Sequence, residues 1–174
     1  VKTKKLASYF SKTKIPKIVI HPGGMLQWIQ NDAIDRQATN EMYLNLSKSL
    51  KPFQDNNQVE LLLENMPPFP WYFGGQWKHS IFMDADGISS FCKEQNINLC
   101  LDFSHAALYC NFAKTSLRDY VKKLIPLTKH LHIADASNGV DGEGLQIGEG
   151  GIDFKSFKSD LLDYSGTFTV EIWQ

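Results

Sequence analysis

The sequence predicts an α/β protein whose core is a parallel β-sheet covered by helices. Three observations support this prediction. Short apolar segments alternate with longer segments of helical periodicity from residue 16 to the end of the chain. The apolar segments lack polar alternation, as expected for strands buried on both faces. The length of 174 residues is sufficient for one domain with a sizeable core.

The expected strands and helices follow one another in strict alternation. Strands are expected at 16–21, 58–65, 98–103, 129–135 and 167–173. Helices are expected between them at 27–50, 84–96, 116–127 and 153–164, where apolar residues recur at helical spacing. Asp84 or Asp86 can cap the second of these helices. Each strand and the helix after it therefore form one β/α unit.

The spacing of the units fits part of a (β/α)8 TIM barrel. Such a barrel takes about 250 residues, or roughly 30 for each unit, and the expected strand ends recur here every 30 to 43 residues. Five strands cannot close an eight-stranded barrel. We therefore expect a single domain over residues 1–174, a partial barrel of about five β/α units truncated at both ends. The alternative is an open five-stranded sheet, whose apolar edges would be prone to pairing.

Composition and charge exclude several classes of protein. Hydrophobic residues make up 43% and charged residues 21%, which is ordinary for a globular protein. The net charge of −1 argues against a nucleic-acid partner. Three cysteines without a CxxC spacing indicate a reducing, cytoplasmic compartment rather than a disulfide framework. No apolar run reaches the roughly 20 residues of a membrane span, and the basic start lacks the apolar centre of a secretory signal.

Each expected strand carries a possible metal ligand at or near its end. These residues are His21, Glu64, Asp102, His132 and Glu171. Parallel strands bring their C-terminal ends to one edge of the sheet, where several carboxylates would repel one another unless a cation took their charge. Imidazole and carboxylate donors together suit Zn, Mn, Fe or Co better than Ca. The sequence therefore predicts a metal site in which His21 is either a further ligand or a simple strand end.

Two more residues near these strand ends have two interpretations each. His105 follows Asp102 by three residues and is expected either to face the metal and its ligand or to cap the next helix. Asp135 follows the fourth strand and is expected either to bind metal or substrate, or to anchor other groups of the site.

The strand-end segments resemble those of a known superfamily. "VIHPGG", "LLLENMPP", "CLDFSHAAL", "HLHIAD", "GLQIGEGGIDF" and "TVEIWQ" are similar to successive motifs of the xylose isomerase-like TIM barrels. That group contains sugar-phosphate isomerases and epimerases and the endonuclease IV family. The resemblance runs from about residue 15 to the end and implies the third to seventh strands of the barrel. It implies a core site for a divalent ion (Mn, Zn, Co or Mg) at Glu64, Asp102, His132 and Glu171.

One departure from the endonuclease pattern separates two branches of this superfamily. Endonuclease IV relatives bind three zinc ions, and His21 and His105 match ligands of the second and third ion. The third ion also needs an Asp-x-His pair, which is replaced here by Gly142 and Gly144. Glu143 and Asp141 lie nearby as the only acidic substitutes. The departure favours the sugar branch over an AP endonuclease.

The resemblance implies a metal-dependent isomerase or epimerase of a sugar or sugar phosphate. Its metal would stabilise an ene-diolate formed when a C–H proton leaves. Glu64 and Glu171 would be the proton-transfer pair, and His105 would hold a substrate hydroxyl. The alternatives are an AP endonuclease and a non-catalytic metal-binding relative. The expected partner is a small carbohydrate, with homo-oligomers possible because such barrels often pair.

Two loops are expected to shape the substrate site. The segment "MPPFPWYFGGQW" (66–77) follows Glu64 and contains Trp71 and Trp77, which are candidate substrate contacts together with Asn65. Its alternative role is burial against other parts of the barrel or an oligomer contact. The glycine-rich segment 138–154 is expected to be a lid or substrate loop that carries Glu143 as a candidate contact. The alternative is a plain flexible connection.

Overall fold

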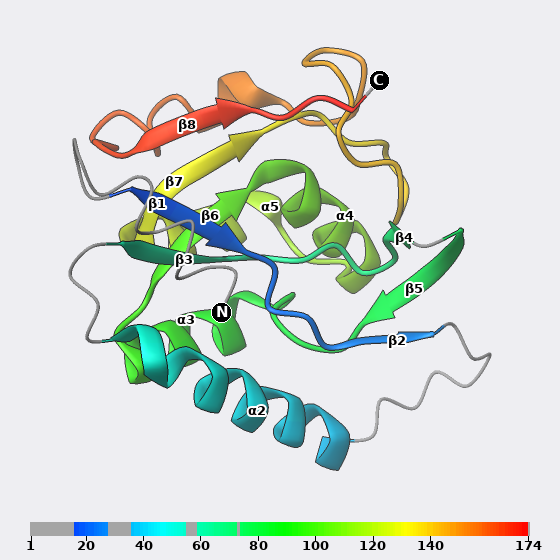
Figure 1. Ribbon diagram of the computed structural model, residues 1–174. Helices are drawn as coiled ribbons and strands as arrows, with labels where there is room; N and C mark the ends of the chain where they lie inside the picture. Colours follow the sequence, from blue (N-terminus) through cyan, green and yellow to red (C-terminus); the bar gives the residue numbers. More distant parts are fainter. Residues whose placement is uncertain (1–15, 28–35, 55–58, 73, 174) are drawn as a thin grey trace.

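A five-stranded parallel sheet forms the centre of the protein. The computed structural model describes residues 16–27, 36–54, 59–72 and 74–173. The sheet has the order β1-β3-β6-β7-β8, with every neighbouring pair parallel. Its strands are β1 (Lys17–Ile20), β3 (Glu60–Glu64), β6 (Asn98–Asp102), β7 (Thr128–Ile133) and β8 (Thr167–Val170). The sheet curls like part of a barrel wall (Figure 1), which agrees with the predicted α/β class.

Apolar side chains explain why the central strands are buried on both faces. In β3 the adjacent residues Leu62 and Leu63 point to opposite faces and both are fully buried. In β6 the same holds for Leu99 and Cys100. The parallel register places Leu63 beside Leu99. Because no polar face remains in these strands, the central part of the sheet is covered by other parts of the chain on each side.

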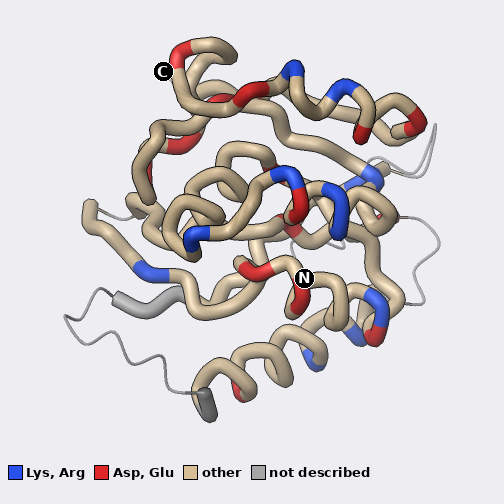
Figure 2. The backbone as a smooth tube through the Cα atoms, turned by 180° about the vertical axis from the view of Figure 1, so that it is seen from behind, with Lys and Arg blue, Asp and Glu red and all other residues tan. Residues whose placement is uncertain are grey.

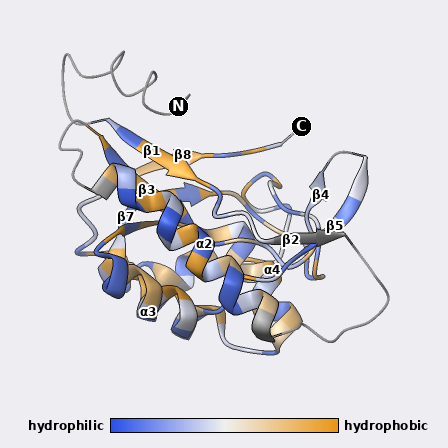
Figure 3. Cartoon of the chain, turned by 60° about the horizontal axis from the view of Figure 1, so that its bottom comes forward, coloured by the Kyte–Doolittle hydropathy of each residue, from blue (hydrophilic) through white to orange (hydrophobic). Residues whose placement is uncertain are grey.

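Helices pack on the sheet and close the core. They are α2 (Arg36–Gln54), α3 (Ala85–Gln95), α4 (Phe103–Ala113) and α5 (Leu117–Leu124), with short 3-10 turns η1 (Ile125–Leu127) and η2 (Phe154–Phe157). Figure 3 shows hydrophobic and hydrophilic residues alternating along α2 and α3, as expected for helices with one face against a sheet. Ile88 of α3, together with Val121 and Leu124 of α5, is fully buried in the main core.

A small antiparallel sheet lies beside the main sheet. Its order is β2-β5-β4, with β2 (Met25–Gln27), β4 (Trp71–Tyr72) and β5 (Gly75–His79). The segment 66–77 is therefore partly a hairpin rather than a loop. The expected start of the first helix at residue 27 is wrong, because Gln27 pairs with Trp77 in this sheet. Residues 28–35 of that expected helix lie outside the described residues.

Two other expectations about helices need correction. The segment 103–113 forms α4, which starts directly after β6 and was not assigned a helix from the sequence. The helix expected at 153–164 is wrong, since only the 3-10 turn η2 forms there. The Ser156 hydroxyl donates to the Asp153 carbonyl, and the Asp153 carboxylate accepts from Lys155 N–H. Such local bonds compete with a regular helix.

The sheet is open between β1 and β8, its two edge strands. Phe168 and Val170 of β8 are exposed, although both are apolar. The expected fifth strand is also shorter than predicted, because β8 ends at Val170. Within the described part of the chain, no helix combines the length and apolar character needed to cross a membrane.

Candidate metal centre

The parallel strands carry acidic and imidazole side chains to one edge of the sheet. Glu64 and Asp102 are the last residues of β3 and β6, and His132 is the penultimate residue of β7. Glu171 directly follows β8, and its backbone N–H donates to the Ile133 carbonyl at 3.1 Å. Since these strands are neighbours and parallel, their C-terminal ends meet on one side.

The four predicted ligands lie within reach of one another. Glu64, Asp102, His132 and Glu171 each offer one ligand atom, and these atoms all lie within 4.8 Å of each other. His132 Nδ1 is at the centre, 2.6 Å from Glu171 Oε2, 3.2 Å from Glu64 Oε1 and 3.8 Å from Asp102 Oδ2. The structure thus brings the predicted set together, while metal binding itself stays a prediction.

The donor set fits a divalent transition metal. Three carboxylates and one imidazole offer hard oxygen and borderline nitrogen donors, which suit Mn, Zn, Fe or Co. Glu64 and Asp102 are both buried, so their negative charges need a compensating cation. Cys100 lies with Glu64 and His132 in a second group of possible ligands. That thiol is fully buried one layer below the strand ends.

The imidazole and carboxylate groups of this cluster shift one another's pKa. Burial opposes the charged form of His132, but hydrogen bonds with Cys100, Glu171 and Glu64 outweigh it and raise the pKa to about 12. Burial also opposes the charge of Glu64, yet hydrogen bonds from His132 and His21 lower its pKa. These opposite shifts favour the charged forms of the His132 imidazole and of the Glu64 carboxylate.

Asn65 holds Asp102 in place rather than facing the metal cluster. Its side-chain amide donates to the Asp102 carbonyl at 3.0 Å, and its Oδ1 accepts from Asp102 N–H at 2.7 Å. Both ends of this buried side chain are therefore occupied by protein groups. The structure does not support the predicted substrate contact and makes Asn65 a clamp between β3 and β6.

His105 lies beside the cluster and also belongs to a helix start. The Asp102 carboxylate caps α4 by accepting from His105 N–H at 2.7 Å. The imidazole Nδ1–H donates to the Asn65 carbonyl at 2.9 Å and lies 3.4 Å from Glu64 Oε1. Its Nε2 is 3.3 Å from Glu143 Oε2. Burial disfavours the charged ring, but Asp102 and Glu143 raise its pKa to about 10.

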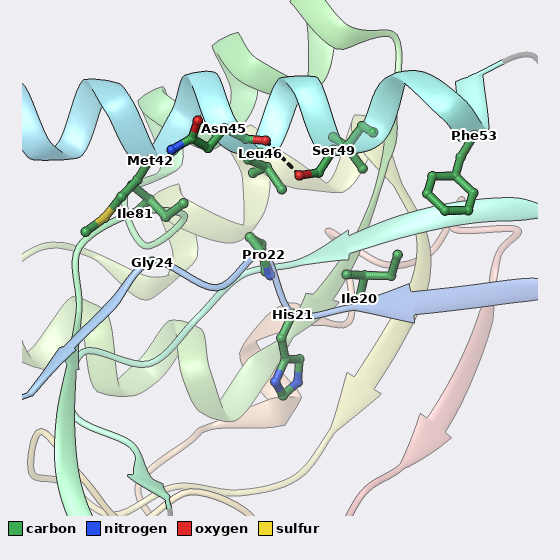
Figure 4. A pocket seen from close by; sticks show the side chains of 11 residues that line it. Ile20, His21, Pro22, Gly24, Met42, Asn45, Leu46, Ser49, Phe53 and Ile81 are labelled. Carbon is green, nitrogen blue, oxygen red and sulfur yellow. Dashed lines mark hydrogen bonds between the residues drawn. The ribbon is translucent and has the colours of Figure 1, made fainter. Parts of the chain in front are cut away.

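His21 contacts the cluster from the edge strand. Its Nε2 lies 3.2 Å from Glu64 Oε2, and half of its side chain is exposed. A cavity of about 370 Å³ runs between α2 and the end of β1. Figure 4 shows that the His21 ring turns away from α2, whereas Ile20 and Pro22 lie on the helix side. His21 thus contacts Glu64, but it does not belong to the group of four possible ligands formed by Glu64, Asp102, His132 and Glu171.

Asp135 anchors the glycine-rich segment and is not part of the cluster. Its buried carboxylate accepts from the N–H groups of Ala136, Gly148 and Ile152 at 2.9 to 3.0 Å. Burial would raise the pKa of this carboxyl group, but these backbone donors outweigh burial and lower it. The anchoring interpretation of Asp135 therefore fits the structure better than a ligand role.

The aromatic hairpin places its residues differently from the prediction. Trp71 is 64% exposed, so the structure does not bring it to the cluster. Trp77 donates from Nε1 to the Tyr72 carbonyl at 2.8 Å and ties β5 to β4. Tyr72 has its pKa raised by burial and then by the charges of Glu143 and other acidic residues of the site. Tyr72 rather than Trp71 is the aromatic residue near the site.

Tyr72 and His79 were not among the site residues predicted from the sequence, although Tyr72 belongs to the aromatic segment 66–77. Successive residues of a strand face opposite sides, so Trp71 and Tyr72 cannot both face the cluster. That alternation was the available signal for Tyr72, but it requires knowing that this segment is a strand. His79 is buried at the end of β5, and no motif or spacing marked it in the sequence.

A comparison with protein families decides which group the chain belongs to. The family model described as "Xylose isomerase-like TIM barrel" matches residues 2–174. The chain belongs to the xylose isomerase-like TIM barrel family. This confirms the resemblance drawn from the strand-end motifs, and it confirms that the five-stranded sheet is part of a (β/α)8 barrel.

Solved structures of xylose isomerase-like proteins share this fold. A putative xylose isomerase from Rhodospirillum rubrum has 13% identity and a TM-score of 0.72, covering 99% of this chain and 59% of that chain. A D-tagatose 3-epimerase-like protein has 23% identity and a TM-score of 0.65, covering 90% and 55%. A probable 3-DHS dehydratase from Bacillus anthracis has 16% identity and a TM-score of 0.66, covering 99% and 62%.

Two curated relatives are similar over half of their length. Both are uncharacterized proteins of Methanocaldococcus jannaschii. One is 25% identical over 155 residues, which are 89% of this chain and 53% of that protein. The other is 29% identical over 159 residues, which are 88% and 50%. The chain thus spans about half the length of the curated relatives it matches.

Proposed function

We propose that this chain forms the metal-binding half of a sugar isomerase or epimerase. One observation carries the proposal. Four residues from the ends of four neighbouring strands place their ligand atoms within 4.8 Å of one another, in a chain of the xylose isomerase-like family. Structurally similar proteins described as a D-tagatose 3-epimerase-like protein and an L-ribulose 3-epimerase support the choice of chemistry.

The residues of the chain supply binding and proton transfer. A divalent ion at the four ligands would act as a Lewis acid toward the carbonyl and an adjacent hydroxyl of the sugar. Glu64 Oε1 lies 3.2 Å from His132 Nδ1, and Glu171 Oε2 lies 2.6 Å from the same nitrogen. Each carboxylate has a second oxygen to take or return a proton at the carbon next to the carbonyl, and in Glu64 this oxygen also contacts His21 Nε2 at 3.2 Å. We assign them as the proton-transfer pair.

His105 and Glu143 form the polar wall next to this pair. The His105 ring is buried and held by the Asn65 carbonyl at Nδ1, which directs Nε2 toward Glu143 at 3.3 Å. A substrate hydroxyl inserted between them would accept from His105 and donate to Glu143. We therefore assign His105 to substrate orientation, with Glu143 as its partner.

The charges of the described residues favour a neutral sugar over a sugar phosphate. Among these residues, the ion pairs of the site join carboxylates to imidazoles, whereas ion pairs of lysine or arginine involve Asp86 and Asp160. Figure 2 shows many of the lysine and arginine residues on the outer helices and turns. A phosphate binds best where cations or helix N-termini face it, and an acid-rich site repels it.

The geometry of the glycine-rich segment weakens the nuclease alternative. Gly142 and Gly144 replace the Asp-x-His pair of endonuclease IV relatives, and both have a positive φ of 90° and 74°. A Cβ on Gly144 would lie 2.0 Å from Trp173 Cδ1. A histidine at this position therefore requires a strained left-handed backbone and displacement of the Trp173 side chain. This supports the sugar branch over three-metal phosphodiester cleavage.

Solvent deuterium exchange tests the proposed reaction directly. The protein is loaded with Mn²⁺, Zn²⁺ or Co²⁺ and incubated in D₂O with D-tagatose, D-fructose and L-ribulose, and with the phosphate esters of D-tagatose and D-fructose. We expect deuterium at the carbon next to the carbonyl of a neutral ketose, detected by NMR. Absence of exchange with every metal and sugar would overturn the proposal, as would cleavage of DNA at abasic sites.

Asp102→Asn separates the metal role of Asp102 from its role in folding. Asparagine caps a helix about as well as aspartate, so α4 keeps its start while the site loses a carboxylate. We expect metal affinity and exchange activity to fall at least 100-fold with little change in stability. The control is Asp84→Asn, which alters the cap of α3 in the same way. Unchanged metal content in the Asp102 variant would contradict the assignment.

A further inference from the structure

The ring of His130 bridges two hydroxyl groups of the neighbouring strand. Its Nδ1 lies 2.7 Å from Thr167 Oγ1, and its Nε2 lies 3.1 Å from Thr169 Oγ1. A hydroxyl group can donate or accept, so both bonds form whichever ring nitrogen carries the proton. In the register of the two strands, His130 of β7 stands beside Thr167 of β8. The imidazole therefore ties β8 to β7 through side chains, in addition to the backbone hydrogen bonds of the sheet.

His130 lies on the same face of the sheet as a candidate ligand. His130 and His132 are two residues apart in β7, and side chains two apart in a strand point to the same face. Leu131 between them is buried in the main core on the helix side. The rings of His130 and His132 meet edge to face, with centroids 5.3 Å apart and an interplanar angle of 87°. His130 therefore packs directly against His132 on the face away from the core.

The edge strand β8 has few other contacts that hold it in place. It pairs with β7 alone among the described strands, and the two lie side by side in Figure 1. All four of its residues, Thr167–Val170, are exposed, so burial of apolar surface contributes little to its position. Glu171 follows directly, and its Oε2 lies 2.6 Å from His132 Nδ1. The position of this candidate ligand therefore depends on how firmly β8 is fixed to β7.

Lys17 supports the same pair of strands from the opposite edge of the sheet. Its Nζ donates to the Lys129 carbonyl at 2.8 Å and to Thr167 Oγ1 at 3.3 Å. Because β1 and β8 are the two edges of the curled sheet, this side chain bridges them. Thr167 accepts from the ammonium group, and its own hydroxyl proton remains available for His130 Nδ1. The hydroxyl group that holds His130 is thus itself held from a second direction.

We propose that His130 is a positioning residue of the candidate metal centre: held by Thr167 and Thr169, it fixes β8 against β7 and so sets where Glu171 stands relative to His132. This inference rests on the proposed metal-dependent function and adds to it a residue outside the group of four possible ligands. Ligands that are fixed before an ion arrives lose less conformational entropy when it binds. Removal of the His130 bonds therefore weakens metal binding although every ligand is still present.

His130→Phe tests this role, because phenylalanine keeps an aromatic ring beside His132 but cannot bond the two hydroxyl groups. In the metal-free protein we expect the β8 amides to exchange with solvent about 3- to 10-fold faster, which corresponds to the loss of one or two weak hydrogen bonds. In titrations with Mn²⁺ we expect Kd to rise by a similar factor. The visible absorption of bound Co²⁺ should change as well, since it reports the arrangement of the ligands around the ion.

Isosteric changes on β8 test the same bonds from the other side. Thr167→Val combined with Thr169→Val removes both hydroxyl groups and keeps the shape of the side chains. We expect this pair to raise Kd for Mn²⁺ about as much as His130→Phe, and all three changes together to add little, because they remove the same bonds. Thr128→Val is the control, since it removes a hydroxyl of β7 that bonds the Leu124 carbonyl at 2.9 Å instead. It should lower the free energy of unfolding and leave Kd for Mn²⁺ unchanged.

The outcomes distinguish this inference from the proposed function. An unchanged Kd for Mn²⁺ in His130→Phe, or an equal rise in Thr128→Val, overturns the positioning role alone. A wild type that binds neither Mn²⁺ nor Co²⁺ overturns the proposed function and this inference together. A wild type that binds Mn²⁺ more tightly than His130→Phe, but exchanges no deuterium into any of the sugars, supports the positioning role and overturns the isomerase or epimerase function.

Discussion

At the scale of single residues, Asp102 combines two tasks through its two oxygens. Oδ1 accepts from Ser104 hydroxyl and from His105 N–H, both at 2.7 Å, and so starts α4. Oδ2 faces His132 at 3.8 Å. The strand-to-helix turn thus fixes the direction of the carboxylate before any metal binds, and Asn65 fixes its backbone. A ligand held in this way loses little conformational entropy when an ion binds.

His79 gives the protein a predictable response to acid. The folded-state pKa of about 4 lies below the unfolded value of 6.5. The buried neutral ring therefore contributes stability fully above pH 6.5, and this contribution is lost as pH falls from 6.5 toward 4. The shift corresponds to about 3 kcal/mol. We expect urea unfolding to show a smaller loss of stability between pH 7 and 4.5 in His79→Asn than in the wild type.

Comparison of the two proteins at both pH values isolates this effect from the titration of the carboxylates, which both share. An equal loss of stability in the variant and the wild type would show that the ring is not buried as a neutral group.

At the scale of elements, one carboxylate organises the glycine-rich segment. Asp135 N–H and carbonyl pair with Leu145 at 2.8 and 2.9 Å. Its carboxylate then accepts from Gly148 and Ile152 further along. The segment is therefore folded back on the end of β7 rather than free. This holds Glu143, in the middle of the segment, against His105.

Gly150→Ala should disrupt this fold of the segment. A Cβ there would lie 2.2 Å from the Ala136 carbonyl oxygen and 2.4 Å from Asp135 Oδ1, so backbone must shift. We expect a loss of about 1–3 kcal/mol in the free energy of unfolding, with faster hydrogen exchange at Gly148 and Ile152. Gly139→Ala is the matched control, since its nearest atom is the Ser137 hydroxyl at 3.2 Å. Equal stability of the two variants would contradict the anchoring role of Asp135.

The strands were predicted correctly from the sequence where a run of buried apolar residues determines the structure. The strands around Leu62 and Leu99 are apolar throughout, and that pattern predicts a strand in a covered parallel sheet. The hairpin at Trp71–His79 depends on pairing with β2, a distant segment, and no local pattern reveals such pairing. In the segment 153–164, helical spacing of apolar residues was outweighed by local bonds of Asp153.

The candidate site was likewise predictable only in part. The convergence of the four candidate strand-end residues was predictable, because parallel strands align their C-terminal ends whatever the details of packing. The orientation of the Asn65 amide was not, since only the register between β3 and β6 places it against Asp102. The choice between Trp71 and Tyr72 likewise depends on which face of a short strand is turned inward.

At the scale of the whole molecule, all four candidate ligands lie in one half of a barrel. They come from β3, β6, β7 and the residue after β8, and β8 is an edge of the sheet. Phe168 and Val170 on that edge strand are exposed. Metal binding can thus be tested directly on the 174-residue chain.

Metal binding should stabilise the sheet through its edge strand. An ion that binds only the folded state adds about 2.7 kcal/mol when its concentration is 100 times Kd. Because Glu171 follows β8, we expect Mn²⁺ both to raise the urea midpoint and to slow hydrogen exchange of the β8 amides. Glu171→Gln should remove most of the effect on β8, whereas Glu149→Gln, an exposed acid of the glycine-rich segment, should leave it intact. If Mn²⁺ stabilises the protein while exchange in β8 stays the same, Glu171 is not a ligand and the ion is held by the other strands.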